Sequence, residues 1–358
     1  MEHASMSLEQ ICAKIGDLDQ ASGELAKQRL ERLTKPPGSL GRLETLVIQL
    51  AEITGQPLPR IFPPGIAVFA GDHGIVAEGV SAFPQEVTGQ MVRNFAAGGA
   101  AINVFARQIG AKLDITDVGT AADLSEVEGV RQRKVREGTG NFAREDAMSR
   151  QEAVEAIAAG IESAARLIEE GAECIIPGEM GIGNTTSSTA IAAVITGRST
   201  EELTGAGTGL NPDARKRKAA LIQRALEARK PDPADALDII SKIGGLEIAA
   251  MTGAILAAAA RRKPVLLDGF ICGVAAVLAV KLASGVRGYL IAGHRSQEPG
   301  HEAVLEWLGL EPLLDLQLRL GEGSGAAVAY PLLESAVRML AEMATFESAG
   351  ISGASSPS

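Results

Sequence analysis

The chain has 358 residues, of which 46% are hydrophobic and 22% are charged, so it can fold around one large core or two domains. A formal net charge of −10 and an aromatic content of 3% argue against a nucleic-acid partner, which would need a basic stripe and stacking platforms. No signal peptide and no apolar run of about 20 residues is visible, so we expect a cytoplasmic protein without a membrane span. The spacing of Cys12, Cys174 and Cys272 fits neither a zinc motif nor a disulfide framework.

The sequence of the first 309 residues predicts two helical segments at its start, followed by strands that alternate with helices. Apolar spacing predicts helices over 7–33 and 41–53, which a Pro-Pro-Gly break separates. Short apolar runs then predict strands at 66–70, 111–118, 174–176, 264–267 and 289–292. Helical patterns lie between them at 86–108, 154–169, 187–195, 215–227, 246–259 and 273–282. This alternation predicts an α/β fold with a Rossmann-like parallel sheet flanked by helices.

The C-terminal part returns to helical patterns, which we assign to 310–320 and 326–343 around a glycine turn. These helices and the N-terminal ones lie outside the α/β alternation. We therefore expect three parts: a small helical domain from 1–60 plus 310–348, a Rossmann-like domain from 61–309, and a frayed tail at 349–358.

Residues 177–190, with the sequence PGEMGIGNTTSSTA, carry the clearest functional signal. They follow a short predicted strand, combine Glu179 with three glycines, and continue through Asn, Thr and Ser into an apolar helix. Backbone N–H groups at a helix start favour an anion, and glycines let a ligand approach closely. An acid beside such a cradle indicates a phosphorylated substrate and chemistry next to it. The alternative is a turn whose Ser and Thr residues only cap the helix.

Three further polar clusters follow predicted strands, at residues 71–74, 268–270 and 293–301. Ligands of parallel sheets bind beyond the carboxyl ends of the strands, so we expect all of these clusters at one edge. The two histidines in 293–301 would allow a metal site. However, this Pro- and Gly-containing loop lacks the helical spacing of zinc ligands.

Other segments leave alternatives open. The sequence GAGTGL at 205–210 is similar to half of a dinucleotide fingerprint, but the Asn-Pro that follows favours a loop. Lys216 and Lys218 belong either to a solvated helix face or, in the less favoured interpretation, to a phosphate site. Glu322 lies between two glycines, either as an incidental acid in a helix–helix turn or as a carboxylate placed there for function.

Six motifs together resemble the nicotinate-nucleotide–dimethylbenzimidazole phosphoribosyltransferase family, in order over almost the whole chain. They are KPPGSLGRLE at 35–44, GDHG at 71–74, GEMGIGNTT at 178–186, DGF at 268–270, HRSQEPGH at 294–301 and LGEGSG at 320–325. The resemblance implies a homodimeric enzyme of cobalamin biosynthesis. It would move phosphoribose from nicotinate mononucleotide to 5,6-dimethylbenzimidazole, giving α-ribazole 5′-phosphate and nicotinate.

The resemblance also implies roles for individual residues. Glu322 would be the catalytic base, and Glu179 would contact the ribose or another part of the substrate. The remaining substrate-binding residues would be Gly181, Gly183, Asn184, Thr185, Gly207, Lys218 and Ser296 around the phosphoribosyl group, and Ser81, Phe83 and Met91 around the aromatic base. The chain departs from the family pattern at Gly71 and at Ser324, where threonine is common, and neither change touches the carboxylate.

The implied chemistry fits a single catalytic carboxylate. Nicotinate leaves from a nitrogen that is already positive, so no general acid is required, in contrast to a glycosidase. One base takes the N–H proton of the incoming benzimidazole, attack from the opposite face inverts the anomeric carbon, and no metal or redox cofactor is needed. Two alternatives stay open: a hydrolase or dehydrogenase that uses Asp72 and His73, and a sensor that holds a phosphate ligand without turnover.

Overall fold

A six-stranded parallel sheet lies at the centre of the fold, with strand order β3-β2-β1-β4-β5-β6. The structure is a computed structural model and describes residues 7–205, 209 and 211–352. The strands are β1 (Pro64–Gly71), β2 (Lys112–Gly119), β3 (Val130–Gln132), β4 (Cys174–Met180), β5 (Val265–Leu267) and β6 (Leu290–Ala292). The predicted Rossmann-like sheet is confirmed. Its winding direction reverses between β1 and β4, which is where such sheets bind ligands.

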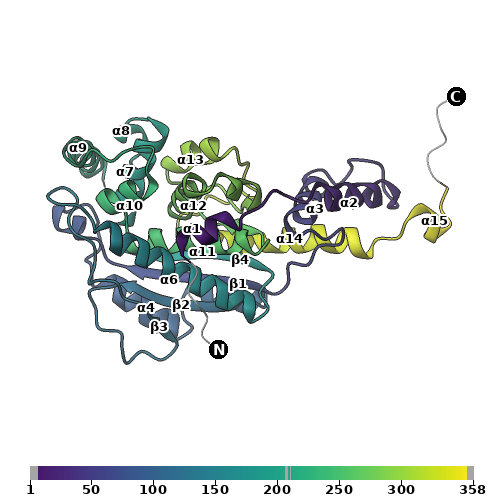
Figure 1. The fold of residues 1–358 in the computed structure, drawn as a ribbon, viewed down its shortest axis with the longest axis horizontal. Coiled ribbons are helices and arrows are strands. Elements are labelled where there is room, and N and C mark those ends of the chain that lie inside the picture. The colour runs from purple at the N-terminus through teal and green to yellow at the C-terminus, as the bar shows by residue number, and fades with distance from the viewer. Residues whose placement is uncertain (1–6, 206–208, 210, 353–358) are drawn as a thin grey trace.

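Helices flank the sheet, and every residue of β1 is buried beneath them. In Figure 1, α6 and α11 lie across the strands, and both contact β1 and β2. The helices are α1 (Leu8–Ala13), α2 (Gln20–Arg32), α3 (Arg42–Thr54), α4 (Val87–Ala96), α5 (Ala101–Gln108), α6 (Arg150–Glu169), α7 (Asn184–Thr196), α8 (Thr200–Leu203), α9 (Pro212–Arg229), α10 (Ala236–Ile243), α11 (Leu246–Ala260), α12 (Phe270–Leu282), α13 (Gly300–Leu308), α14 (Ser324–Glu342) and α15 (Phe346–Ala349), with 3₁₀ turns η1 (Gly74–Glu78) and η2 (Ser284–Tyr289).

Helices α6 and α11 pack with their backbones in contact, because each places a glycine at the crossing. A Cβ atom at Gly160 would collide with the carbonyl oxygen of Ala250, and one at Gly253 would collide with that of Ile157. Most of the other α11 residues are small and fully buried. This close packing gives the sheet a rigid support. Glu247, in the first turn of α11, lies at the end of β1, since a Cβ atom at Gly71 would come 3.0 Å from its carboxylate.

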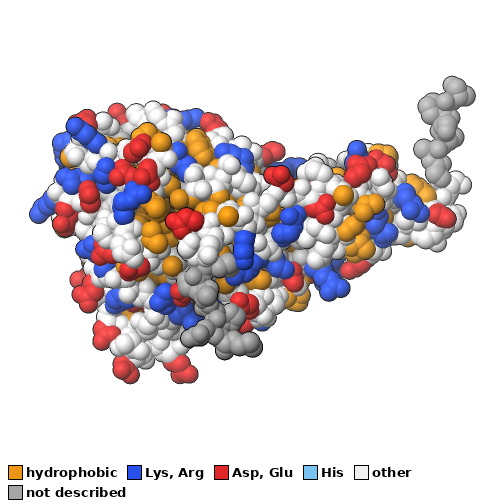
Figure 2. Space-filling view, in the orientation of Figure 1, with side chains coloured by type: hydrophobic (Ala, Val, Ile, Leu, Met, Phe, Trp, Pro, Cys, Tyr) orange, Lys and Arg blue, Asp and Glu red, His pale blue; other side chains and the backbone are white. Residues whose placement is uncertain are grey.

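Helices α2 and α3 lie beside α14 in an arm that extends from the body in Figure 1, whereas α1 lies on the body and contacts α6 and α11. The Arg29 guanidinium of α2 donates to the carbonyl oxygens of Leu340 and Ala341 at the end of α14, and α3 also packs against α14. Figure 2 shows cationic and anionic side chains interspersed over this face of the body and the arm. The division into a helical domain (1–60 plus 310–348) and a Rossmann-like domain (61–309) stays a prediction.

The predicted helix at 310–320 is wrong. This segment is extended beside the end of β6: the N–H groups of Leu313 and Leu314 donate to the carbonyl oxygens of Ala292 and Gly293. The leucines at 314, 316, 318 and 320 alternate with polar residues, which is the period of an extended chain and not of a helix. The segment therefore leads back along the sheet edge to the glycine turn before α14.

Other predicted boundaries also change. The helix expected over 7–33 is divided into α1 and α2, since Asp19 caps a new helix start, and the one expected over 86–108 is divided into α4 and α5. The sequence patterns missed β3, α8, α10, α13 and α15. Of the tail at 349–358, residues 353–358 lie outside the described residues. Within the described part of the chain, no helix has the length and apolar character to cross a membrane.

Candidate active site

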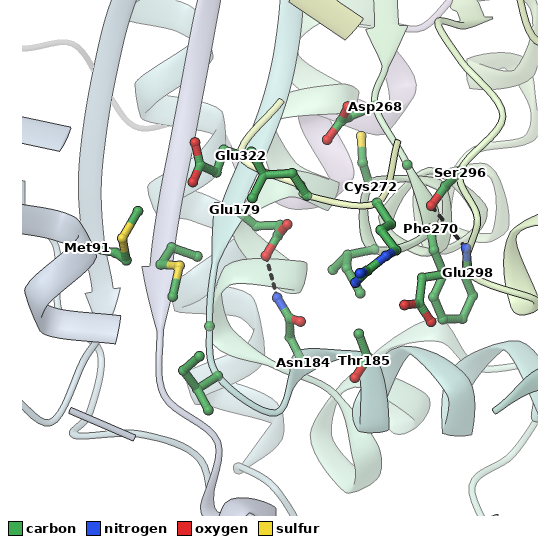
Figure 3. A pocket seen from close by; sticks show the side chains of 18 of the residues that line it. Met91, Glu179, Asn184, Thr185, Asp268, Phe270, Cys272, Ser296, Glu298 and Glu322 are labelled. Atoms are coloured by element: carbon green, nitrogen blue, oxygen red, sulfur yellow. Dashed lines mark hydrogen bonds between the residues drawn. The ribbon is translucent and has the colours of Figure 1, made fainter. Parts of the chain in front are cut away.

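A cavity of about 420 Å³ opens at the carboxyl edge of the sheet (Figure 3). The segments that line it come from far apart in the sequence, at 83–91, 179–185, 268–272, 294–298 and 319–322. Three of the four strand-end clusters noted in the sequence therefore meet at one cavity. The fourth, at 71–74, lies close to the glycine loop, since a Cβ atom at Gly181 would come 2.6 Å from the carbonyl oxygen of Gly71.

The structure brings most of the predicted site residues to this cavity. Those that line it are Phe83, Met91, Glu179, Gly181, Asn184, Thr185, Ser296 and Glu322. Gly183 and Lys218 lie directly behind the lining, where Gly183 precedes α7 and Lys218 contacts Thr185. The Ser81 hydroxyl accepts the N–H of Phe83 at 3.2 Å, so it lies beside the lining. Gly207 lies outside the described residues.

The glycine loop creates an open helix start. Strand β4 continues through Met180, so Glu179 belongs to the strand, and the loop proper is short. Gly183 has a φ of 95°, which favours glycine, and a Cβ atom there would come 2.7 Å from Val76. Among the described residues, no side chain caps the start of α7. The N–H groups of Asn184 and Thr186 donate to the carbonyl oxygens of Gly181 and Gly183 at 3.1 and 2.9 Å. What this start offers to an anion is therefore mainly the positive end of the helix dipole, with no carboxylate of the described residues placed against it.

Lys218 on α9 reaches the same helix start. Its Nζ donates to the Thr185 hydroxyl at 2.7 Å, and its side chain is buried, which excludes the solvated helix face considered from the sequence. Burial lowers the pKa of Lys218 to about 8, while the nearby Glu298 carboxylate opposes that shift. A buried cation beside an uncapped helix start is an arrangement that attracts a phosphate.

Glu322 occupies an unusual backbone position before α14. Its φ is 63°, a left-handed conformation that is uncommon for a residue other than glycine, and its carboxylate is buried. The N–H of Ile102, in the first turn of α5, donates to its Oε2 at 3.3 Å. Burial raises the pKa of Glu322, and the charge of Asp268 adds to this effect, while the bond from Ile102 opposes it.

Glu179 shares the cavity with Glu322, as Figure 3 shows. The Asn184 side-chain amide and the Glu322 backbone N–H both donate to the Glu179 carboxylate. Burial, together with the charges of Glu247 and Asp268, raises the pKa of Glu179 to about 8 against the effect of those bonds. The strand residue and the turn residue, more than a hundred positions apart in the sequence, thus contact each other directly.

Asp268 contributes to the site in a way that the sequence did not reveal. Its carboxylate accepts the N–H groups of Gly323, Gly325 and Ala326 at 3.1, 2.7 and 3.1 Å, and His294 Nε2 lies 3.2 Å from it. These contacts connect the end of β5 and the loop after β6 to the start of α14.

The two histidines of 293–301 are engaged in holding the loops. His301 Nδ1 accepts the Ser296 N–H at 2.9 Å. Burial, together with His294 and Arg295, lowers the pKa of His301 to about 3, so this ring is neutral. In the described part of the chain, no cluster of three or more His, Cys, Asp or Glu side chains has the geometry to hold a metal. The metal site considered for this loop therefore has no support in the arrangement of these side chains.

His73 belongs to a buried network behind the cavity. Its Nε2 lies 2.6 Å from Glu247, and its Nδ1 lies 3.1 Å from the Ser187 hydroxyl. This resembles a serine–histidine–carboxylate triad, but all three side chains are fully buried and none lines the cavity. Asp72 is likewise buried and accepts the N–H of Ala121. A nucleophile without access to substrate does not support a hydrolase.

Comparisons with known proteins agree with this geometry. A family model described as phosphoribosyltransferase matches residues 15–351. A relative from Chloroflexus aggregans, named nicotinate-nucleotide–dimethylbenzimidazole phosphoribosyltransferase, is 52% identical over 96% of this chain and 98% of its own length. One of the same name from Desulforamulus reducens is 54% identical over 96% of this chain and 99% of its own. The chain belongs to this family.

The fold leads to the same family. A crystal structure from Thermus thermophilus with the same enzyme name has a TM-score of 0.89 and 45% identity, and it covers 94% of this chain and all of the other. A second structure from that organism, titled CobT, has a TM-score of 0.90 and 46% identity over 93% of this chain and all of the other. The resemblance seen in the six motifs is confirmed, and the protein is a phosphoribosyltransferase enzyme. A sensor without turnover is therefore the weaker alternative.

Proposed function

We propose that this enzyme transfers phosphoribose from nicotinate mononucleotide to 5,6-dimethylbenzimidazole, with Glu322 as the general base. The products are α-ribazole 5′-phosphate and nicotinate. The observation that carries the proposal is the placement of a buried carboxylate, Glu322, in the same cavity as an uncapped helix start. The names of the relatives support the choice of substrates.

The phosphate of nicotinate mononucleotide binds at the start of α7. Gly181 and Gly183 bring the backbone N–H groups close, Thr185 lines the cavity, and Lys218 supplies a positive charge behind it. Ser296 adds a hydroxyl from the loop after β6. This set holds the doubly charged end of the substrate and fixes the ribose relative to the base. Glu179, between this phosphate site and Glu322, contacts the ribose.

The aromatic base binds on the apolar side of the cavity. Phe83 and Met91 line it there, and Leu320 borders it from the turn before α14. Phe83 is 50% exposed and Leu320 60% exposed, so each has apolar surface to cover on a flat, dimethylated ring. Ser81, beside Phe83, offers a polar group at the edge of this surface.

The reaction then needs one proton transfer. The benzimidazole nitrogen lone pair attacks the anomeric carbon from the face opposite nicotinate, and the C–N electron pair of the old bond returns to the pyridine ring. The N–H proton of the new ribazole moves to Glu322. Because burial raises the pKa of Glu322, its carboxylate is a stronger base than one in water. Inversion from β to α follows from attack on the opposite face.

One assay tests the proposal directly. Purified protein is incubated with nicotinate mononucleotide with and without 5,6-dimethylbenzimidazole, and nicotinate and the new nucleotide are quantified by chromatography with mass spectrometry. We expect nicotinate release that depends on the added base and a product whose anomeric proton signal in NMR is that of the α form. Release of nicotinate at the same rate without the base, or a β product, would contradict the proposal. We also propose a homodimer, which light scattering after size-exclusion chromatography tests.

A further inference from the structure

The turn that carries Glu322 needs an external support. Gly321, Glu322 and Gly323 have φ angles of 92°, 63° and 86°, so three consecutive residues adopt the left-handed conformation. Glycine adopts it readily, but for glutamate it costs free energy and persists only where the surroundings hold it. The structure around the turn shows which groups do so.

Asp268 makes several contacts to this turn. It follows β5, is 3% exposed, and accepts three backbone N–H groups from the first turn of α14 and the residue before it. Its Oδ2 accepts the N–H of Gly323, and its Oδ1 accepts those of Gly325 and Ala326. A carboxylate at a helix start makes charge-assisted hydrogen bonds and interacts favourably with the helix dipole. Both oxygens are therefore engaged by the protein itself.

His294, from the loop after β6, supports Asp268 from the other side. Its Nε2 lies 3.2 Å from Asp268 Oδ1, and its ring fills the space beside Gly325, where a Cβ atom would collide with it. Two strands of the sheet thus send one residue each to the start of α14. The N–H of Ile102, from α5, holds the Glu322 carboxylate itself.

We propose that Asp268, held by His294, is a positioning residue that fixes the start of α14 so that the Glu322 carboxylate faces the bound substrates. This inference rests on the proposed role of Glu322 as the base. Asp268 acts through the backbone and does not take a proton from the substrate, because both of its oxygens accept hydrogen bonds from the protein. Its charge also influences the base electrostatically.

The test compares Asp268→Asn in two backgrounds. In the otherwise unchanged enzyme, we expect kcat to fall about 10–100-fold while KM for nicotinate mononucleotide changes less than about 3-fold. In the Glu322→Gln background, the same substitution should change kcat less than about 2-fold, since the group through which Asp268 acts is already lost. A fall of similar size in both backgrounds would overturn the inference.

A matched control is Asp235→Asn. Asp235 also accepts backbone N–H groups at a helix start, that of α10, but lies outside the cavity. The Asp235→Asn substitution should lower Tm by a few degrees, as loss of a cap does, and leave kcat within about 2-fold of the unchanged enzyme.

The pH profile of kcat is a second readout for Asp268→Asn. Loss of the negative charge near Glu322 should move the acid limb of this profile to lower pH, and an unmoved limb would count against the inference.

His294 gives a second variant that keeps Asp268 in place. We expect His294→Ala to lower kcat about 3–10-fold and His294→Gln, which keeps a donor near Asp268, to restore most of it. If both variants keep the kcat of the unchanged enzyme, the proposed role of His294 in holding Asp268 is wrong. Near-normal turnover of Glu322→Gln alone would instead contradict the proposed function, so the two failures are distinguishable.

Discussion

The starts of α7 and α14 are built alike but are completed differently. Each is preceded by a left-handed glycine, Gly183 with a φ of 95° and Gly323 with a φ of 86°, and neither has a capping side chain of its own. At α14, Asp268 supplies the missing acceptor from a neighbouring strand. At α7, no carboxylate among the described residues takes that place, and Lys218 lies nearby instead.

This difference indicates what each helix start does. A start that the protein closes with its own carboxylate is rigid, and it suits a residue whose position must be fixed, such as Glu322. A start that stays open and has a cation beside it suits an anion that arrives with the substrate. Substitutions in the two regions should therefore differ in effect: those at the closed start should lower kcat, and those at the open start should raise KM.

The strongest test of the closed region is Glu322→Gln. Loss of a positioned base should lower kcat about 10²–10⁴-fold with little change in KM, because the amide keeps the shape of the side chain but does not accept the proton. Steady-state kinetics measure this. Glu342→Gln, at the exposed far end of the same helix, is the control and should keep normal turnover. A normal kcat in the Glu322→Gln enzyme would mean that another residue is the general base.

The strongest test of the open region is Lys218→Ala. KM for nicotinate mononucleotide should rise about 10–100-fold with a smaller change in kcat, since a hydrogen bond to a charged group contributes about 1.5–3 kcal/mol. Lys216→Ala, on the exposed side of the same helix, serves as the control. The pKa of Lys218 is lowered to about 8, so KM of the unchanged enzyme should rise as pH increases through that value. Equal KM values for both variants would argue against a phosphate at α7.

Gly183→Ala tests the shape of the open region. The left-handed φ costs alanine about 1–2 kcal/mol. The added methyl group would also press on Val76 at 2.7 Å. Gly171→Ala is a matched control, because Gly171 has a φ of 99° and open space around it. We expect Gly183→Ala to lower Tm more than Gly171→Ala and to raise KM for nicotinate mononucleotide several-fold. Identical Tm losses would show that the contact with Val76 relaxes freely.

The smallest effect concerns Glu179, which lies between the two regions. Its pKa is about 8 in the folded protein against an ordinary value of 4.5. Between these values the folded protein holds a proton that the unfolded chain has released, so this group's contribution to stability is lost as pH rises toward 8. Melting curves should therefore show a smaller fall in Tm from about pH 5 to about pH 8 for Glu179→Gln than for the unchanged protein, by a few degrees.

The exposed Glu128→Gln is the control for this measurement and should follow the unchanged protein. If Glu179→Gln also has the same pH dependence of Tm as the unchanged protein, the carboxyl of Glu179 is ionised throughout this range. Its contact with the ribose would then be that of a carboxylate.

Much of the fold was predictable because its signals are local. Apolar runs of strand length and the helical patterns between them require only near neighbours, and they predicted five of the six strands. β3 is three residues long, with a single buried side chain, and so has almost no pattern of its own. The segment at 310–320 is rich in leucine but does not form the predicted helix, because four of its leucines recur with the period of two of an extended chain.

The sequence by itself determined the class of fold, the family through six ordered motifs, and the residue types of the site. Only the tertiary structure decided which of these residues meet. Lys218 suited a solvated helix face by its neighbours in the sequence, but packing buries it against Thr185. Asp268 lies 55 positions before Gly323, and no local pattern connects a strand end with a helix start at that distance. Such contacts depend on how the sheet and helices pack, because packing brings distant segments to one edge.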